Sequence, residues 1–463
     1  MLRLLSILHD VVWGIPTVAI VLGIGLYLSV VTWFPQIRLL PGAIRQLFRK
    51  PGQDEGAVTP FRAMCTALGA TVGTGNLAGV AGAICLGGPG AVFWMWICGF
   101  IGMATKFSEI VLAYFYRTRR GKEFIGGPMY LITNGMGSRW KWLAAVYSLL
   151  GLVAAIGIGN ATQVDAVVSG CNKVLSLAGI GESTAGNLIM GILLAAILGT
   201  MLMGGAGSVG KIAERLVPFS ASAYVILCGI LIFFRRGALH VAFAAIIKGA
   251  FHPRAFTGGI IGSVFRCMSV GCARGVFTNE AGMGTASIVH ASANARHPVE
   301  QGMMGLLEVM IDTLVICTLT ALVILCGGTP VPYGKDLGIS LTISAFRNFY
   351  GDWVSVLLTL FLCSFAFATM MGWGLYGARC CEFLFGPNSW KNFIWAEMGA
   401  IILGSVIHTE YIWLMADTIN GMMILPNLIA LTALSPKLIA VTKAYGKGSP
   451  VETEQKGRRE LQD

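Results

Sequence analysis

Charged residues are scarce in this chain. Only 12% of its 463 residues are Asp, Glu, Lys or Arg, whereas 55% are hydrophobic, and soluble domains usually carry about 25% charged residues. The mean hydropathy is +0.73. A chain with so little charge does not have the composition of a soluble domain. We therefore expect an all-helical integral membrane protein.

Motifs for catalysis and metal binding are also missing. The sequence contains no HExxH or GxSxG motif, and its twelve cysteines include no CxxC or Cys/His spacing typical of a metal site. The stretch 205–211 is similar to a phosphate-binding loop, but Ile212 stands where a Ser or Thr would hold magnesium. We therefore expect neither an enzyme nor a bound cofactor.

Long charge-free runs recur from one end of the chain to the other. A helix must supply about 20 apolar residues to cross a hydrocarbon core of about 30 Å. This length predicts about eleven transmembrane helices, at 12–34, 60–86, 90–116, 142–170, 185–204, 216–234, 258–292, 302–327, 353–378, 393–408 and 412–434. The first run is too long for a signal peptide and no cleavage site follows it, so we interpret it as a retained helix.

Basic residues cluster in alternate connections, at 38–62, 117–141 and 211–215, and again in the C-terminal tail at 443–463. By the positive-inside rule these connections face the cytoplasm. The rule predicts an N-terminus outside the cell and a cytoplasmic C-terminus. The net charge of +11 then reflects membrane orientation, and we expect no nucleic-acid partner.

Two of the predicted helices are interrupted by glycine, at 66–79 and at 271–284. Glycine in a helix interior costs about 1 kcal/mol relative to alanine, so we expect unwound backbone near Gly73 and near Gly275. Unpaired backbone at membrane depth is tolerated only beside a polar cavity. Matched interruptions in the two halves of a chain indicate the substrate site of a secondary transporter.

The predicted helices divide into two groups of five once the first helix, 12–34, is set aside. The groups cover 60–234 and 258–434, and each opens with an interrupted helix. Because five is odd, the second group has inverted topology relative to the first. We predict one transmembrane domain, 1–463, with the LeuT-type five-plus-five inverted repeat.

Seven motifs stand out along the chain: GGPGAVFWMW at 87–96, GMATK at 102–106, TVGTGN at 71–76, GGPMY at 126–130, ARGVF at 273–277, NEAG at 279–282 and LPNLIA at 425–430. They resemble the signature of the alanine/glycine:cation symporter family, the sodium:alanine symporters. The resemblance covers nearly the whole chain. It implies import of a small neutral amino acid, such as alanine or glycine, across a prokaryotic plasma membrane with a cation, usually sodium.

The first interrupted helix predicts a binding site for the substrate carboxylate. Thr74, Gly75 and Asn76 stand where its second half begins, and a helix N-terminus offers free N–H groups and a positive dipole. The segment from Gly69 through Thr71 to Asn76 is also similar to the neurotransmitter:sodium symporters, which implies that the amides of Thr74 and Gly75 hold the carboxylate. The alternative is that these glycines only allow close helix packing.

A sodium site is implied by the same resemblance. Sodium prefers oxygen ligands, and the carbonyls of Gly69 and Val72 would face the hydroxyl of Thr369 on the helix at 353–378. The family pattern has two successive hydroxyl residues there, whereas this chain has Ala368 before Thr369. The departure removes one possible ligand.

The remaining candidate residues lie on three other helices. Phe277 and Thr278 are implied to contact the substrate side chain and ammonium group. Asn160 and Gln163, one turn apart, are candidate hydrogen-bonding partners of the substrate, and Trp373 is a candidate to close the pocket. Packing roles are the alternative for Phe277 and Trp373.

Three of the charged residues in or near the predicted spans, Arg274, Glu280 and Asp165, are candidate functional groups. An unpaired charge at this depth costs several kcal/mol, so Arg274 and Glu280 should have partners, either each other or Glu308 and Asp312. We interpret them as a gate or ion pair. Asp165 is open to three readings: a proton-coupling group, a cation ligand or a residue that reaches the outer water.

The leading hypothesis is sodium-coupled symport by alternating access, with the amino acid, sodium and the lipid bilayer as partners and no obligate protein partner. One alternative keeps the fold and couples to protons through Asp165 or Glu280. Another is a channel, although the chain has no repeated charged ring or filter motif.

Overall fold

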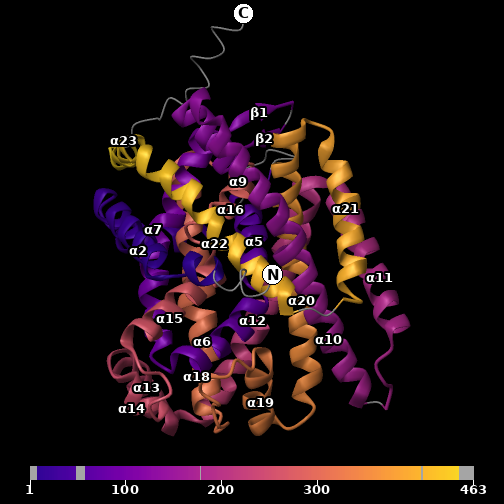
Figure 1. Cartoon of the computed structure of the whole chain (residues 1–463). Coiled ribbons are helices and arrows are strands. Elements are labelled where there is room, and N and C mark those ends of the chain that lie inside the picture. Colours follow the sequence, from indigo (N-terminus) through magenta and orange to yellow (C-terminus); the bar gives the residue numbers. More distant parts are fainter. Residues whose placement is uncertain (1–7, 48–57, 122, 178, 408–409, 448–463) are drawn as a thin grey trace, which may run out of the picture.

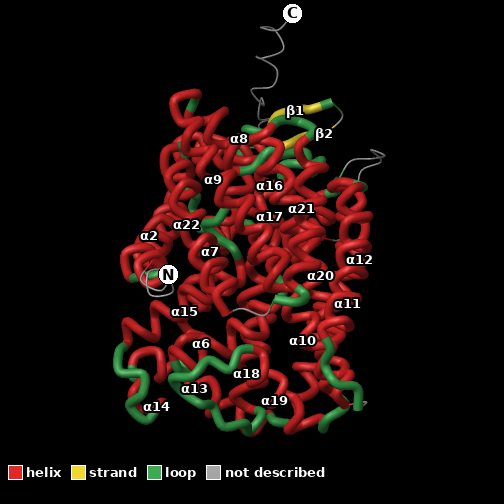
Figure 2. Tube along the Cα trace, turned by 45° about the vertical axis from the view of Figure 1, so that its right-hand side comes forward, coloured by secondary structure: helices red, strands yellow, loops and turns green. Residues whose placement is uncertain are grey.

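The computed structural model describes residues 8–47, 58–121, 123–177, 179–407 and 410–447. Helices stand side by side along one direction, and most loops gather at the two ends of the bundle (Figures 1 and 2). Two short strands, β1 (Thr118–Arg120) and β2 (Glu123–Ile125), form an antiparallel hairpin at the end from which the C-terminus emerges. Most of the predicted C-terminal tail, 443–463, lies outside the described residues.

The first half of the chain supplies fifteen of the described helical elements. They are α2 (Ile15–Val31), α3 (Pro35–Arg38), α4 (Leu40–Leu47), α5 (Pro60–Thr71), η1 (Gly75–Gly79), α6 (Val80–Gly87), α7 (Ala91–Phe115), α8 (Pro128–Leu131), η2 (Ile132–Met136), η3 (Ser138–Trp140), α9 (Lys141–Ala154), η4 (Ala155–Ala161), α10 (Thr162–Leu177), α11 (Thr184–Met203) and α12 (Gly205–Phe234). The stretch 205–211 that is similar to a phosphate-binding loop forms the first turns of α12.

The second half of the chain continues the bundle. Its elements are η5 (Arg236–Ala238), α13 (Leu239–Phe251), α14 (Pro253–Thr257), α15 (Val264–Asn279), α16 (Thr285–His290), α17 (Pro298–Val309), η6 (Met310–Cys317), α18 (Thr318–Cys326), α19 (Ile339–Tyr350), α20 (Val354–Phe385), α21 (Ser389–Gly404), α22 (Glu410–Ala433) and α23 (Ser435–Gly446).

Membrane-spanning length and hydropathy identify seven helices in the described part of the chain. They are Leu8–Val31, Ala91–Phe115, Ser138–Ser176, Thr184–Met203, Gly205–Phe234, Pro298–Cys326 and Val354–Phe385. Two bent pairs, Pro60–Thr71 with Gly75–Gly87 and Asp417–Ala433 with Ser435–Gly446, raise the number to nine. The predicted spans 258–292 and 393–408 correspond to α15 with α16 and to α21, so the count of eleven stays a prediction.

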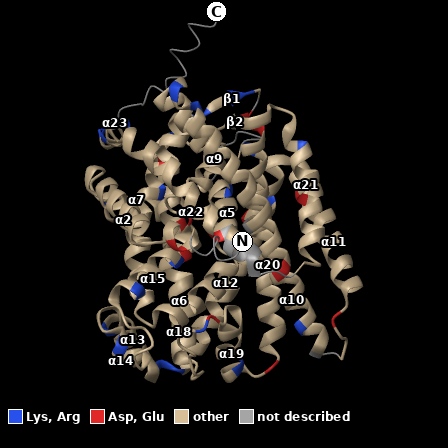
Figure 3. Ribbon diagram, viewed as in Figure 1, with Lys and Arg blue, Asp and Glu red and all other residues tan. Residues whose placement is uncertain are grey.

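The distribution of charge agrees with a membrane protein. Lys and Arg lie mostly towards the two ends of the bundle, whereas several Asp and Glu lie nearer its middle (Figure 3). The most apolar stretch of Ala91–Phe115 is 78% buried inside the protein, whereas that of Leu8–Val31 is 28% buried. Helix α7 is therefore central, and α2 lies at the periphery.

Three π-helical turns interrupt helices near the middle of the bundle. They are η1 after the first break, η4 between α9 and α10, and η6 between α17 and α18. A π-helical turn widens the backbone spiral and is frequent at functional sites. These turns carry Gly75, Asn76, Asn160 and Asp312, and they therefore position several of the predicted site residues.

Candidate functional site

The first predicted break is present. Helix α5 ends at Thr71, Val72 adopts an extended conformation (φ −73°, ψ 95°), and the helix that follows is bent by 50°. The last carbonyls of α5 have no following turn to donate to them, and the first N–H groups of the second half have no preceding turn to accept from them. The amides of Thr74 and Gly75 begin this second half.

Asn76 braces the break instead of facing a cavity. Its side-chain oxygen accepts a hydrogen bond from the Gly73 amide (3.0 Å), and its nitrogen donates to Asp312 on η6 (2.7 Å). Both side chains are fully buried. Asn76 therefore ties the unwound segment to the second half of the chain.

A small cavity lies against the unwound segment. Its volume is about 20 Å³, and its walls come from the first break, α10, the end of α15, α20 and α22. It is lined by Ala70, Thr71, Gly73, Thr74, Gly75, Gln163, Phe277, Glu280, Thr369, Trp373 and Asn420. The structure thus brings together most of the residues predicted for the substrate site, from five separate segments.

Two other predicted substrate residues do not line this cavity. The Thr278 hydroxyl donates to the Gly275 carbonyl within its own helix (2.9 Å). The Asn160 side chain donates to the Ala155 carbonyl (2.9 Å) and to Glu397 on α21 (2.7 Å). Sequence periodicity places Asn160 and Gln163 one turn apart. It does not reveal that Asn160 lies in the π-helical turn η4 and contacts α21, whereas Gln163 lines the small cavity.

The predicted sodium ligands lie close together. The Thr369 hydroxyl donates to the Gly69 carbonyl (3.1 Å), and Val72 caps α5 three residues further on. A Cβ atom on Gly73 would lie 2.7 Å from the Thr369 oxygen, so only glycine leaves this space open. The Gly69 carbonyl and the Thr369 hydroxyl are oxygen ligands of the kind that a hard cation prefers.

A larger cavity of about 710 Å³ adjoins the small one. The two share Thr74, Gly75 and Phe277 as lining residues, so the Phe277 ring and the start of η1 separate them. Asp165 lines the larger cavity and is half-buried.

Arg274 and Glu280 do not pair with each other, contrary to the first of the predicted arrangements. Arg274 reaches Asp336, with 3.6 Å between Nη2 and Oδ2, at the wall of the larger cavity. Glu280 accepts hydrogen bonds from the Trp373 indole (3.0 Å) and the Thr285 hydroxyl (2.5 Å). Arg274 and Glu280, both in the C-terminal part of α15 and its cap, therefore face separate cavities.

The second break lies further along the chain than predicted. Helix α15 is continuous through Gly275 to Asn279, and the unwound segment is 280–284. Glu280 (φ 54°), Gly282 (φ 99°) and Gly284 (φ 77°) have positive φ, a conformation that favours glycine. Gly275 instead allows close packing, because a Cβ there would lie 3.3 Å from that of Cys98.

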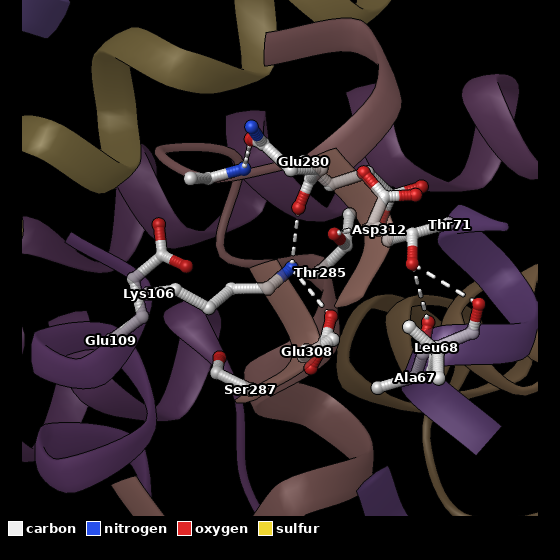
Figure 4. A network of polar contacts seen from close by, with 12 residues as sticks. Ala67, Leu68, Thr71, Lys106, Glu109, Glu280, Thr285, Ser287, Glu308 and Asp312 are labelled. Carbon is white, nitrogen blue, oxygen red and sulfur yellow. Dashed lines mark hydrogen bonds and ion pairs between the residues drawn. The ribbon is translucent and has the colours of Figure 1, made fainter. Parts of the chain in front are cut away.

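Charged side chains hold this second break. The Lys106 ammonium on α7 donates to the Asn279 carbonyl (2.8 Å) and pairs with Glu308 on α17 (2.9 Å). Figure 4 shows Lys106 extending towards Glu308, with Glu280 on its other side. Lys106 is fully buried, so this ion pair is shielded from water and screened little by salt.

Glu109 completes this arrangement one turn further along α7. One carboxylate oxygen accepts from the amides of Gly282 (2.8 Å) and Gly284 (3.1 Å) and from the Asn427 side chain (2.7 Å). We call Lys106, Glu109, Glu308 and Asn427 the buried clamp. From the sequence, Lys106 and Asn427 are only parts of family motifs, and Glu308 is only a possible ion-pair partner. Two charged residues within one predicted span, Lys106 and Glu109 in 90–116, could have indicated a buried charged cluster.

The fold resembles that of a solved protein. The crystal structure of MhsT in complex with L-phenylalanine matches 85% of this chain and 99% of its own chain, with a TM-score of 0.58 at 14% identity. This likeness shows the class of fold: the protein is all-helical and has the LeuT fold.

Similarity of sequence gives the family. The profile of the sodium:alanine symporter family matches residues 1–459. The sodium/alanine symporter AgcS of Methanococcus maripaludis is 38% identical over 96% of this chain and 97% of its own length. The probable sodium/glutamine symporter GlnT of Bacillus subtilis is 34% identical over 96% and 90%. The chain belongs to the sodium:alanine symporter family, a family of amino-acid:cation transporters and not of enzymes.

Proposed function

We propose that this protein imports a small neutral amino acid, alanine or glycine, together with sodium by alternating access. The observation that carries the proposal is the small cavity at the first break, where helix N-terminal amides and a carbonyl–hydroxyl pair meet. Membership of the sodium:alanine symporter family and the names of two relatives, a sodium/alanine and a probable sodium/glutamine symporter, support it.

The cavity offers partners for both ends of an amino acid. The amides of Thr74 and Gly75 are placed to donate to a carboxylate, favoured by the dipole of the helix they begin. Glu280 and the side-chain oxygen of Asn420 are acceptors for the ammonium group. This Asn420 oxygen is buried and has no hydrogen-bond partner among the residues that the structure describes. Glu280 and Asn420 take the role that sequence analysis assigned to Thr278.

The size of the cavity favours a small side chain. Its volume of about 20 Å³ is close to the space that one water molecule occupies, so the walls must move apart even for alanine. The rings of Phe277 and Trp373 are the bulky parts of that wall. A larger amino acid would require a larger displacement of both rings.

Sodium coupling follows from sharing one unwound segment. The carbonyls of Gly69 and Val72 precede the break and the amides of Thr74 and Gly75 follow it. A sodium ion held by the carbonyls and Thr369 orders the segment that presents the amides, so each ligand raises the affinity for the other by the same factor.

Alternating access requires that the cavity open to each side in turn. The larger cavity is lined by residues from connections that the positive-inside rule places outside the cell, including Lys173 and Asp336. In this orientation the N-terminus is outside and the C-terminus is in the cytoplasm. The larger cavity then faces the outside of the cell, and Phe277 separates it from the small cavity. A prokaryotic plasma membrane is the location that the family implies.

Uptake into proteoliposomes tests this proposal. We expect labelled alanine to accumulate against its gradient when sodium is imposed outside, and glycine to compete better than larger neutral amino acids. A potassium gradient of the same size is the matched control. Equal uptake in both gradients overturns sodium coupling.

The same assay separates the alternatives. Uptake driven by a pH gradient without sodium would favour proton coupling. One relative at 32% identity, from Bacillus subtilis, is named putative sodium/proton-dependent alanine carrier protein YrbD. Asp165 and Glu280 are the proton carriers to replace with their amides. Flux that never exceeds equilibrium would favour a channel.

A further inference from the structure

A carboxyl group is buried outside the small cavity and outside the buried clamp. Glu397 lies on α21 and is fully buried. One of its oxygens, Oε1, accepts a hydrogen bond from the side-chain nitrogen of Asn160 (2.7 Å). None of the salt bridges among the described residues includes Glu397. This acid is therefore held by an amide alone.

The second oxygen of each side chain has no hydrogen-bond partner among the described residues. Glu397 Oε2 and Asn160 Oδ1 are both buried, and neither has a hydrogen-bond partner in the described part of the chain. An ionised carboxylate and an amide oxygen can only accept, so neither can satisfy the other. An unpaired ionised carboxylate in such surroundings costs many kcal/mol, and proteins avoid this by binding a proton.

A single proton on Glu397 Oε2 gives both oxygens a hydrogen-bond partner, because the new O–H group can donate to Asn160 Oδ1. A protonated Oε2 becomes a donor, and the Asn160 oxygen is an acceptor on the amide that already donates to Oε1. A carboxylic acid and a primary amide are complementary in this way, with one hydrogen bond in each direction. A sodium ion would instead need several further oxygen ligands, whereas Leu202 and Gly374 lie beside Glu397.

Other charged groups do not compensate Glu397. The charged and titratable residues on the elements packed against α21, and on α21 itself, are Asp165, Cys171, Lys173, Cys363, Tyr376, Arg379, Cys380, Cys381, Glu382 and Lys391. Of these, Arg379 pairs with Glu382 (2.8 Å) and Glu123 (2.8 Å). Asp165 and Lys173 line the larger cavity.

Asn160 and Glu397 are connected to the small cavity through Gly159, which packs on the cavity-lining Trp373. Asn160 also donates to the Ala155 carbonyl within η4 (2.9 Å), so it closes this π-helical turn. The next residue back, Gly159, packs so closely on Trp373 that a Cβ would lie 2.3 Å from the tryptophan Cβ. Trp373 lines the small cavity and donates to Glu280.

A cavity of about 370 Å³ lies close to Glu397. Its lining includes Leu202, Leu375, Ile394 and the charged residues Arg120 and Glu382. Leu202 and Glu397 Oε1 both lie 2.7 Å from a Cβ built on Gly374, so the cavity reaches a neighbour of the carboxyl group.

We propose that Glu397 and Asn160 form a proton-binding site, in which Glu397 takes up one proton from hydronium in the solution on Oε2 and, while keeping it, donates a hydrogen bond to Asn160 Oδ1. The proton holds η4 in place and thereby seats Trp373 against the substrate cavity. Glu397 is thus a positioning residue that acts through Asn160 and the tryptophan. The proposal goes beyond the transport function, because it assigns a chemical state to a group that touches neither substrate nor sodium.

Infrared spectroscopy of the purified protein tests the proposal without any substrate. The parent protein at neutral pH should have a protonated carboxyl band that is missing in Glu397→Gln, whose amide mimics the neutral acid and should preserve the fold. Asn160→Leu should shift this band, since it removes the hydrogen bond to the acid. Asp165→Asn is the matched control and should leave the band unchanged.

Several outcomes overturn the proposal. A parent-minus-E397Q difference spectrum without a carboxylic acid band means that Glu397 is ionised, and a band that disappears on adding sodium means a cation site. If E397Q fails to fold, the shift in the Asn160→Leu spectrum decides alone, and an unshifted spectrum contradicts the proposal.

Alanine binding supplies a readout that a merely structural role would not move. Raising the pH removes the proton from the parent, so its affinity for alanine should fall at alkaline pH. Glu397→Gln cannot lose a proton and should keep its affinity over the same range. Identical pH profiles of alanine affinity for parent and variant would refute the positioning role of Glu397. The infrared spectra test the proton on Glu397, and sodium-driven uptake tests the proposed transport function, so the three results are independent.

Discussion

The two helix breaks differ in how their backbone groups are satisfied. At 280–284 all five amides have acceptors in the protein, from Val276, Asn279, Glu109 and Glu280, and the Asn279 carbonyl binds Lys106. At the first break the amides of Thr74 and Gly75 begin a helix beside the small cavity. The second break is closed by the protein's own charged side chains, whereas we propose that the first presents its backbone to a ligand.

This difference shows that unwound backbone in a membrane helix is not by itself a binding site. Such backbone needs polar partners in a medium without water, and these can come from side chains or from cargo. The buried clamp supplies them at the second break. Substitutions in the clamp should therefore affect folding, and those at the first break should affect ligand binding.

The largest effect should come from Lys106→Met. This change leaves the carboxylate of Glu308 and the Asn279 carbonyl without their cation, and breaking a buried ion pair from one side costs about 3 to 5 kcal/mol. We expect a large loss of thermal stability of the detergent-solubilised protein. The double variant Lys106→Met with Glu308→Gln should recover part of it, and exposed Lys141→Met is the control. An unchanged melting temperature would contradict the clamp.

Gly73→Ala should weaken alanine binding by about 100-fold while preserving the fold. The added Cβ would lie 2.7 Å from the Thr369 hydroxyl, and misplacing a site by about 1 Å can cost about 100-fold. The measurement is sodium-dependent binding of labelled alanine. Gly79→Ala is the matched control, because its Cβ would meet only Thr278 at an ordinary 3.8 Å. Equal losses in both variants would mean that general helix packing, not the site, is disturbed.

Thr369→Val should act mainly on sodium. It replaces the hydroxyl that contacts the Gly69 carbonyl by a methyl group of similar size, so we expect the sodium concentration for half-maximal alanine binding to rise about tenfold, or about 1.4 kcal/mol. Thr369→Ser keeps the hydroxyl and should restore most of the affinity. A sodium requirement that is the same in both variants argues against Thr369 as a ligand.

Arg274→Gln should have the smallest effect. The Arg274 and Asp336 side chains are 26% and 37% exposed, and exposed ion pairs contribute about 0 to 1 kcal/mol and are screened by salt. We expect a change in alanine affinity of no more than about fivefold, weaker at high ionic strength. A complete loss of binding would instead place Arg274 in the site.

The sequence could point to the residues around the first break because its signals there are local. The glycines at 69–75 mark both the break and the positions where a side chain would fill the site, and Thr369, Gln163, Phe277 and Trp373 then gather around it. Family resemblance supplied the correspondence between helices that lie far apart in the chain. These two sources suffice for residues that touch the break directly.

The rest depends on geometry that one sequence does not carry. Glycine content alone could not distinguish packing at Gly275 from the left-handed turns at Gly282 and Gly284. The π-helical turn η4 rotates Asn160 away from Gln163, and a helix of regular period gives no sign of it. Charged partners such as Lys106 and Glu308 come from helices whose relative rotation is set by packing.

An experimental structure determined with both sodium and alanine present would test the difference between the two breaks most directly. The account predicts density for the alanine carboxylate at the amides of Thr74 and Gly75, and for a cation beside the Gly69 carbonyl and the Thr369 hydroxyl, with the segment 280–284 held by Lys106 and Glu109. Ligand density bound to the backbone at 280–284, or an α5–α6 helix that is continuous through Gly73, would contradict it.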